Sequence, residues 1–377
     1  MKQIYTNFNK FQIQKILIFN PFGIGDVLFT TPLIRNLKES LKNVSISYLC
    51  NRRVYPLLKS NIFLDNVLVF EKDEWRDLAR KSKLKFTKEI FSFFKRIRNE
   101  NFDVVFDLSL NSQYGFFLKM AAIPQRIGFN FKNRGRFLTH KINIPNGYSE
   151  QHVARYHLSL LKFLDIMPKE NNFDLFVSEE NLVRTNETLK HAELRQDSLL
   201  VGVCPGSGDS WQATAYYKRW PPEYFLKLCT NLQKELGAQI ILFGSPVEAE
   251  LCDYIYANLK EKTINLCAKI SLEEFCGLIS SCKLVVTNDG GPFHIAQALG
   301  KKAIVFYGPV DEKVYGPYPS STNSLVFTAK VDCRPCYKAF KFTGCSFDKK
   351  CLRKISVEEA FLAARNLLYP ARENHRF

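Results

Sequence analysis

Short apolar runs alternate with amphipathic stretches along most of the chain, a pattern typical of parallel α/β folds. The first run, Lys15–Asn20 (KILIFN), ends at a turn that contains Pro and Gly. Strands buried on both faces of a parallel sheet are continuously apolar, so this run predicts a β-strand. An amphipathic helix is expected next, over Asp26–Leu41. The other strands predicted in the first half are Val44–Cys50, Asn66–Phe70 and Asp103–Leu108, with helices between them.

A second alternating series follows a polar connection at 166–178. Its predicted strands are Leu199–Cys204, Gln239–Phe243, Lys283–Thr287 and Ala303–Tyr307. Its predicted helices are Pro222–Leu236, Pro246–Leu259, Leu272–Ser280 and Gly291–Leu299. The repetition predicts an α/β protein of two Rossmann-like, doubly wound domains that face a central cleft, with ligands at the carboxyl ends of the strands.

The expected domains are an N-terminal domain at 1–168, a C-terminal domain at 169–355 and a terminal segment at 356–377. In the last of these, a helix over Ser356–Leu368 is expected to pack back on the body. No run approaches the roughly 18 apolar residues of a membrane-spanning helix. The first residues also lack the apolar core of a signal peptide, which predicts a cytoplasmic protein.

Positive charge is concentrated in the first half of the chain. The formal net charge is +16, and residues 1–150 contain 25 Lys and Arg but 12 Asp and Glu. This excess indicates a polyanionic partner, such as nucleic acid, anionic lipid or a phosphorylated saccharide. The stretch Trp75–Arg98 mixes basic residues with Phe and Ile. It is typical either of a helix on an anionic membrane surface or of an ordinary helix whose Phe face packs on the sheet.

The eleven cysteines fall into two groups. Seven are scattered through apolar stretches and are expected in the core: Cys50, Cys204, Cys229, Cys252, Cys267, Cys276 and Cys282. The other four, Cys333, Cys336, Cys345 and Cys351, have the spacing C-x2-C-x8-C-x5-C. Four thiolates at such spacing fit a structural zinc or iron site, and four reduced thiols in a loop are the alternative.

Two segments carry candidate chemistry between a strand and a helix. Gly23-Ile24-Gly25-Asp26 follows the first strand, where glycines allow close approach of a ligand and Asp26 lies at a helix start. The alternative is a simple capping role for Asp26. In the second half, Lys218 precedes Arg-Trp-Pro and is suited to neutralise a diphosphate, which Thr214 can also contact. The alternative for Lys218 is an ordinary solvated lysine.

The strongest local signal is Thr287-Asn288-Asp289-Gly290-Gly291-Pro292-Phe293-His294. A strand ends there in a Gly-Gly turn and a helix begins, and a helix N-terminus suits a diphosphate. Asp289 can accept hydrogen bonds from sugar hydroxyls, while His294 is either a ligand contact or a buried structural histidine. Glu248, in the turn FGSPVE, is expected to bind ribose hydroxyls or only to stabilise the first turn of its helix.

Together these pieces resemble glycosyltransferase family 9, whose best-known members are the ADP-heptose:lipopolysaccharide heptosyltransferases. The resemblance runs from about Lys15 to Glu359 and rests on ILIFNPFGIGDVLFTTPLIRNLK, KRWPPEYF, FGSPVEAE, VTNDGGPFHIAQALG and VFYGPVD. It implies the GT-B architecture, two Rossmann-like halves with the donor held mainly by the second. Gly290 departs from the Ser or Thr common in the family, so one hydroxyl is lost while the backbone donors remain.

The resemblance also implies residue roles. Asp26 matches the family's catalytic base, with Gly23 and Gly25 in the acceptor-side glycine loop. On the donor side, phosphate contacts, ribose binding and heptose binding are implied for Lys218, Thr214, Glu248, Asp289, Gly290, Gly291 and His294. Lys218 is expected to act in catalysis as well. Ala213 occupies a position where some members carry a second Thr.

The resulting hypothesis is an inverting transfer of heptose from ADP-heptose to the lipopolysaccharide inner core. No cofactor is required for the reaction, and the enzyme is expected to contact the inner face of the anionic membrane peripherally. The alternatives are another sugar nucleotide, a protein acceptor, or a non-catalytic sugar-nucleotide-binding protein. A nucleic-acid partner is not expected, because no recognisable motif accompanies the charge and the basic excess stops where the second half begins.

Overall fold

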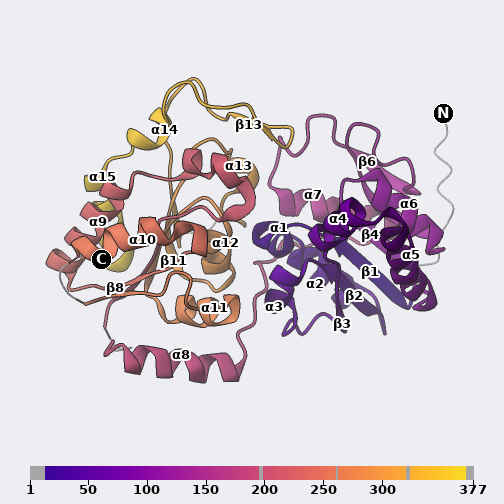
Figure 1. Ribbon diagram of the computed structural model, residues 1–377, viewed down its shortest axis with the longest axis horizontal. Coiled ribbons are helices and arrows are strands. Elements are labelled where there is room, and N and C mark those ends of the chain that lie inside the picture. Colours follow the sequence, from indigo (N-terminus) through magenta and orange to yellow (C-terminus); the bar gives the residue numbers. More distant parts are fainter. Residues whose placement is uncertain (1–12, 195–197, 260–261, 320–322, 371–377) are drawn as a thin grey trace, which may run out of the picture. The chain divides into compact units, whose positions relative to one another are not determined.

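The structure is a computed structural model that describes residues 13–194, 198–259, 262–319 and 323–370 (Figure 1). The chain divides into two compact units, 1–174 and 175–377. Each contains one six-stranded sheet in which every neighbouring pair of strands is parallel. The predicted α/β class with doubly wound sheets is therefore confirmed.

The first unit has the strand order β3-β2-β1-β4-β5-β6. Its strands are β1 (Lys15–Asn20), β2 (Ser45–Cys50), β3 (Asn66–Val69), β4 (Val104–Asp107), β5 (Gln125–Asn130) and β6 (His140–Asn143). Its helices are α1 (Ile24–Leu28), α2 (Thr31–Ser40), η2 (Arg52–Val54), α3 (Tyr55–Leu58), α4 (Lys72–Lys81), α5 (Lys83–Asn99), α6 (Ser112–Met120), α7 (Val153–Ser159) and η3 (Leu160–Leu164).

The second unit repeats this topology with the order β12-β11-β10-β7-β8-β9. Its strands are β7 (Leu200–Cys204), β8 (Gln239–Leu242), β9 (Thr263–Asn265), β10 (Leu284–Asn288), β11 (Lys302–Phe306) and β12 (Ser324–Phe327), with a separate hairpin of β13 (Tyr337–Lys338) and β14 (Lys341–Phe342). Its helices are α8 (Glu179–His191), η4 (Asp209–Lys218), α9 (Pro222–Leu236), η5 (Pro246–Glu248), α10 (Ala249–Asn258), α11 (Leu272–Ser281), α12 (Gly291–Ala298), α13 (Glu312–Tyr315), α14 (Lys350–Arg353) and α15 (Val357–Leu368).

The predicted strands are confirmed to within one residue at each end, because buried parallel strands are continuously apolar. Strands β5, β6, β9 and β12 were not predicted. The helix expected over Asp26–Leu41 is wrong in detail, since the structure has two helices, α1 and α2. The hydroxyls of Thr30 and Thr31 donate to the carbonyls of Val27 and Leu28, and Pro32 lacks an N–H for a helical hydrogen bond.

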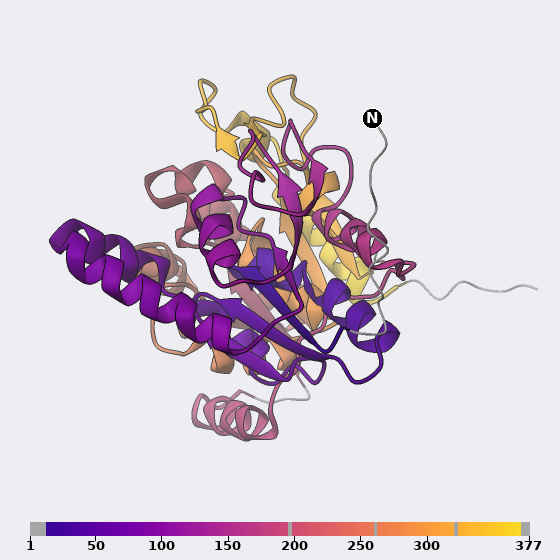
Figure 2. The same cartoon turned by 90° about the vertical axis from the view of Figure 1, so that its right-hand side faces the viewer.

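The basic stretch Trp75–Arg98 also forms two helices, α4 and α5, which lie side by side in Figure 2. They are separated at Ser82, whose Oγ caps α5 by accepting from the N–H of Lys85 at 3.3 Å. Ile90, Phe94 and Ile97 of α5 are buried in the core of the first unit. The interpretation that the Phe face of this helix packs on the sheet is thus confirmed, and the basic side chains lie outside.

Each sheet reverses its strand order at one place, between β1 and β4 in the first unit and between β7 and β10 in the second. Open α/β sheets bind ligands beside such switch points, at the carboxyl ends of the strands. The loop that leads to Asp26 leaves β1, and Asp289 directly follows β10. The topology therefore places both predicted carboxylates where ligands of this fold class bind.

The core of the second unit is built around its sheet and the helices that pack on it. Trp220 is fully buried and stacks on Phe306, with ring centroids 4.0 Å apart. Its indole N–H donates to the carbonyl of Ile355 at 3.3 Å, which connects the segment before α15 to the sheet. Helix α15 packs against α9 and β11. The seven cysteines expected in the core are all buried, which confirms that interpretation.

Helix α8 packs closely on α11 at Gly277, which has no side chain. A Cβ on Gly277 would lie 2.2 Å from Thr185 Oγ1 and 3.2 Å from the carbonyl oxygen of Asn181. Gly277→Ala is therefore expected to lower the free energy of unfolding by about 1–3 kcal/mol through overpacking, measured by urea denaturation.

The matched rescue is the double variant with Thr185→Ala, which removes the 2.2 Å contact with the hydroxyl and leaves those at 3.2 Å with the Asn181 carbonyl and 3.5 Å with the Thr185 Cβ, so it should recover part of the lost stability. Thr185→Ala alone is the control. Equal losses in the single Gly277→Ala variant and the double variant would show that Thr185 does not set the helix spacing.

Candidate active site

The centre of the candidate site is a buried ion pair. Lys218 Nζ lies 2.8 Å from Asp289 Oδ2, and both side chains are less than one-tenth exposed. The geometry meets the distance of an ion pair but lacks the alignment of a hydrogen bond, so Asp289 Oδ2 accepts no hydrogen bond from the described residues. A buried carboxylate oxygen with unused capacity is an expected partner for a ligand hydroxyl.

Two adjacent loops hold this pair at the switch point of the second sheet. Asn288, the last residue of β10, is fully buried and donates through Nδ2 to the carbonyls of Pro205 and Gly206, both at 2.8 Å. Its Oδ1 accepts from the backbone N–H of Trp220 at 2.8 Å. One amide thus joins the loop after β7 to the segment that carries Lys218. Asn288 belongs to the predicted motif, but no role was assigned to it from the sequence because its partners are distant in the chain.

The predicted phosphate turn surrounds the start of α12. Gly290 precedes the helix, and a Cβ there would lie 3.3 Å from the carbonyl oxygen of Ser207. His294 is buried on α12, and burial, with a contribution from the charge of Lys218, lowers its pKa to about 3. The imidazole is therefore neutral at physiological pH. Thr214 is exposed, and its hydroxyl donates to the carbonyl of Trp211 at 2.7 Å.

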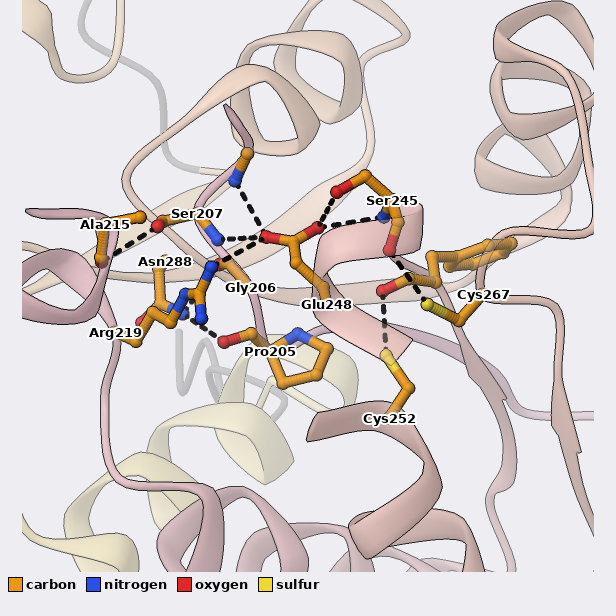
Figure 3. A network of polar contacts seen from close by, with 12 residues as sticks. Pro205, Gly206, Ser207, Ala215, Arg219, Ser245, Glu248, Cys252, Cys267 and Asn288 are labelled. Carbon is orange, nitrogen blue, oxygen red and sulfur yellow. Dashed lines mark hydrogen bonds and ion pairs between the residues drawn. The ribbon is translucent and has the colours of Figure 1, made fainter. Parts of the chain in front are cut away.

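Glu248 is buried, and its two carboxylate oxygens bind different loops, Oε1 the loop after β7 and Oε2 the loop after β8 (Figure 3). Oε1 accepts from the N–H groups of Ser207 at 2.7 Å and Gly208 at 2.9 Å, and Oε2 accepts from the N–H and hydroxyl of Ser245, both at 2.9 Å. A Cβ on Gly206 would lie only 1.8 Å from Oε1, so the carboxylate packs directly against that backbone. The ribose-binding role stays a prediction, and it requires at least one of these donors to be exchanged for a ribose hydroxyl.

A second cation lies beside this carboxylate. Arg219 Nη2 is 3.7 Å from Glu248 Oε1, and its buried Nε has no hydrogen-bond partner among the described residues. The position of Arg219 directly after Lys218 was a signal for a second cation in the sequence. Its partner, Glu248, could not be read from the sequence. The carboxyl edge of the second sheet therefore presents Lys218 and Arg219 together, an arrangement that suits an anionic ligand.

In the first unit, Asp26 lies half-buried in α1, just after the loop that leaves β1. Its Oδ2 accepts from the N–H of Gly23 at 3.3 Å, and its carbonyl accepts from Asn20 Nδ2 at 3.1 Å. The glycine loop thus fixes the carboxylate. Burial raises the pKa of Tyr148, and the charge of Asp26 raises it further. This coupling places the phenol in the electrostatic environment of Asp26.

Sequence reasoning missed a second carboxyl group at the same sheet edge. Asp107 ends β4, which pairs with β1, and Phe19 is its register partner. Burial raises the pKa of Asp107 to about 6, although Ser109 donates to it from its N–H at 3.1 Å and from its hydroxyl at 2.5 Å. The sequence places Asp107 at the end of a predicted strand. Only the strand order shows that this strand lies next to β1, from which the loop to Asp26 leaves. Perturbed carboxyl groups at such an edge are typical of functional sites.

The structure does not support the possible metal site at the four clustered cysteines. The described residues contain no group of three or more His, Cys, Asp or Glu side chains placed to hold a metal ion. Cys351 instead belongs to the apolar core of the second unit, where burial raises the pKa of its thiol to about 11. Cys345 Sγ accepts from the N–H of Lys349 at 3.3 Å. The possible structural zinc or iron is therefore not supported, although the other three thiols contribute to the raised pKa of Cys351.

A separate pocket of about 390 Å³ lies at the opposite edge of the second sheet. Its lining residues include Leu199, Lys283 and Lys302, which are at the amino ends of β7, β10 and β11. Ligands of doubly wound sheets bind at the carboxyl ends, so this pocket is not the candidate active site.

Known proteins share both the sequence pattern and the fold. The family model for glycosyltransferase family 9 (heptosyltransferase) matches residues 90–346. The lipooligosaccharide heptosyltransferase 2 of Campylobacter jejuni is 25% identical over 362 residues, which cover 94% of this chain and 98% of that protein. The lipopolysaccharide heptosyltransferase 2 of Escherichia coli is 24% identical over 78% of this chain and 83% of its own.

Solved structures of glycosyltransferases share the fold of this chain. A family 9 glycosyltransferase from Veillonella parvula has a TM-score of 0.79 at 21% identity and covers 98% of both chains. The ADP-heptose lipopolysaccharide heptosyltransferase II of E. coli has a TM-score of 0.73 at 22% identity, covering 94% of this chain and 98% of that one. An E. coli heptosyltransferase solved with ADP has a TM-score of 0.71 at 18% identity, covering 94% and 100%.

The two parallel sheets and the likeness to these structures show the GT-B architecture, and the family model shows a glycosyltransferase, both as predicted. Since the family model spans most of the chain, this protein belongs to glycosyltransferase family 9.

The raised pKa of Asp107 gives a test of the site's electrostatics. A carboxyl group whose folded-state pKa exceeds its ordinary value contributes stability below about pH 4 that is lost as the pH rises through about 6. Asp107→Asn removes this dependence. Between pH 4 and pH 7.5, the stability of the variant relative to the wild type is expected to rise by about 1–3 kcal/mol in urea unfolding. The control is Asp77→Asn on the exposed surface of α4. A difference that stays flat with pH would contradict the buried, perturbed state of Asp107.

Proposed function

We propose that this glycosyltransferase transfers a heptose from ADP-heptose to the inner core of lipopolysaccharide, with inversion at the anomeric carbon. The observation that carries the proposal is the buried Lys218–Asp289 pair at the carboxyl edge of the second sheet. The family supports the reaction class, the E. coli structure solved with ADP supports the nucleotide, and the relatives' names support heptose and lipopolysaccharide.

In this mechanism the second unit binds the donor. The diphosphate lies at the N-terminus of α12, where free N–H groups of the Gly290–Gly291 turn and the helix dipole favour negative charge. Lys218 and Thr214 contact the phosphates, and Lys218 neutralises the charge that develops on the departing ADP. Asp289 Oδ2 accepts a hydroxyl of the heptose, which supplies the hydrogen bond that it lacks in the described structure.

The first unit supplies the base. Asp26 takes the proton from an acceptor hydroxyl, and the resulting nucleophile attacks the anomeric carbon from the face opposite the leaving ADP. Gly23 and Gly25 leave space for the acceptor next to that carboxylate. Lys218 and the α12 dipole provide the positive charge for the leaving group, so the proposed reaction requires no cofactor.

The acceptor and its lipid give the basic first unit a partner. On α5, Leu84, Lys88, Phe91, Lys95 and Arg98 follow one another at helical spacing and are all exposed. Leu84 is 82% exposed and Phe91 is 43% exposed. Exposed apolar side chains between cations are typical of helices that lie at an anionic membrane interface. No helix in the described part of the chain is both long and apolar enough to cross a bilayer. We therefore propose peripheral contact with the cytoplasmic membrane face through α5.

Two variants separate the roles of the units. Asp26→Asn is expected to lower kcat on the order of 10²- to 10⁴-fold, measured as ADP release with purified lipid A–core acceptor, because the proton acceptor is lost. Its thermal stabilisation by ADP should be unchanged. Lys218→Ala should lower both turnover and stabilisation by ADP, since it contacts the nucleotide directly.

The control is Glu39→Gln, an exposed carboxylate on α2 of the same unit. Near-normal turnover of Asp26→Asn would exclude Asp26 as the catalytic base. Equal stabilisation by ADP, UDP and GDP would contradict an adenosine site, and transfer to a protein instead of lipopolysaccharide would reassign the acceptor.

The membrane contact is tested with vesicles of phosphatidylcholine containing phosphatidylglycerol. Replacing both Lys88 and Lys95 by Glu should weaken cosedimentation on the order of tenfold or more, because each Lys near the surface contributes about 1 kcal/mol. The matched control replaces Lys190 and Lys354, exposed residues of the second unit, by Glu for the same change in net charge. Equal loss in both pairs, or binding that is the same on pure phosphatidylcholine, would exclude a specific surface on α5.

A further inference from the structure

Three aromatic side chains form a cluster beside Lys218. Lys218 Nζ lies 5.0 Å from the centroid of the Trp211 ring. That ring in turn contacts Tyr337 and Phe342, with centroid distances of 5.2 and 5.0 Å. Trp211 belongs to η4 after β7, whereas Tyr337 and Phe342 lie on the β13–β14 hairpin. Lys218 is thus connected through one indole to a distant segment of the chain.

The backbone next to Trp211 is unusual. Gln212 has φ 45° and ψ −127°, a region that residues with a side chain rarely occupy, and it interrupts the helical turns of η4. The hydroxyl of Thr214, which follows this kink, donates to the carbonyl of Trp211, which precedes it. Such backbone geometry persists only where surrounding contacts enforce it, and it clusters at functional sites.

The hairpin that contacts Trp211 is itself anchored to the sheet. The N–H groups of Cys336 and Tyr337 donate to the carbonyl of Pro309 at 2.9 and 3.0 Å, in the loop that follows β11. Phe342 also contacts Tyr217, one residue before Lys218, with centroids 5.4 Å apart. The hairpin therefore provides a fixed support for the indole instead of a loose surface contact.

We propose that Trp211 is a positioning residue that holds the Lys218 ammonium at the diphosphate, with the β13–β14 hairpin holding Trp211. The proposal rests on the function assigned to Lys218 above. A lysine side chain has a flexible four-carbon stem, and an aromatic face attracts the ammonium and restricts the conformations that it samples. Asp289 restrains the same ammonium, but its carboxylate must also serve the sugar. The indole continues to restrain Lys218 when Asp289 changes partners, which preserves the alignment that catalysis requires.

The direct test compares Trp211→Leu with Trp211→Phe. The leucine variant should lower kcat for donor turnover on the order of three- to thirty-fold, with a smaller change in the KM for the donor, because the aromatic face is lost. The phenylalanine variant should recover most of the activity. Phe342→Leu should act in the same direction to a smaller extent. Lys341→Ala, exposed on the same hairpin, is the control and should have no effect.

A double-mutant cycle with Lys218→Met shows whether Trp211 acts through Lys218. Trp211→Leu should have almost no further effect on kcat, or on thermal stabilisation by ADP, in the Lys218→Met background. The same loss in both backgrounds would overturn the proposal and leave the function of Lys218 intact. Loss of activity in Trp211→Phe equal to that in Trp211→Leu would also overturn it. Normal turnover of Lys218→Met alone would instead refute the function assigned to that lysine, and the positioning role with it.

Discussion

The candidate site depends on keeping two opposite charges, Lys218 and Asp289, together inside the protein. Removing either charge from water is costly, and only close pairing makes the arrangement tolerable. The fold meets this requirement with backbone and amide contacts: Asn288 joins the strand end to the loop after β7 and to Trp220, and the N–H of Asp289 donates to the carbonyl of Phe306 at 3.0 Å. The packing of Trp220 on Phe306 therefore affects the geometry of the ion pair through these backbone contacts.

Two buried carboxylates at the same sheet edge, those of Glu248 and Asp289, have different kinds of contacts. Glu248 uses its charge internally, on four donors of two loops, whereas Asp289 keeps one oxygen without a hydrogen bond. The two acidic residues thus differ in their contacts: Glu248 accepts hydrogen bonds from two loops, and Asp289 Oδ2 is paired with the ammonium of Lys218. A motif comparison treats both as ligand contacts, and only the hydrogen-bond partners distinguish them.

Much of the fold was predictable because its information is local. Apolar runs such as Lys15–Asn20 are bounded by Pro and Gly, and their length and composition indicate buried parallel strands without reference to the rest of the chain. A proline after two threonines also indicated the break at Thr30–Pro32. The amphipathic pattern continues across it, and a single helix was therefore predicted. The raised pKa of Asp107 could not be anticipated, since it depends on which strands are neighbours and how deeply β4 is buried. The spacing of the four clustered cysteines does not decide whether they hold a metal, because the placement of the thiols follows from the path of the backbone and not from the count of residues between them.

The close approach of Gly290 to Ser207 has a consequence for how this enzyme can evolve. A Cβ at 290 would lie 3.3 Å from the carbonyl oxygen of Ser207, so a side chain there requires a small shift of the loop after β7; with glycine in place, position 290 offers a ligand only main-chain groups. Main-chain donors are shared by every sequence that adopts the fold, and drift at single positions neither strengthens nor erases them. Selection for a new sugar or nucleotide would accordingly have to act on the surrounding side chains, while the main-chain donors of the proposed phosphate turn pass unchanged from one descendant to the next.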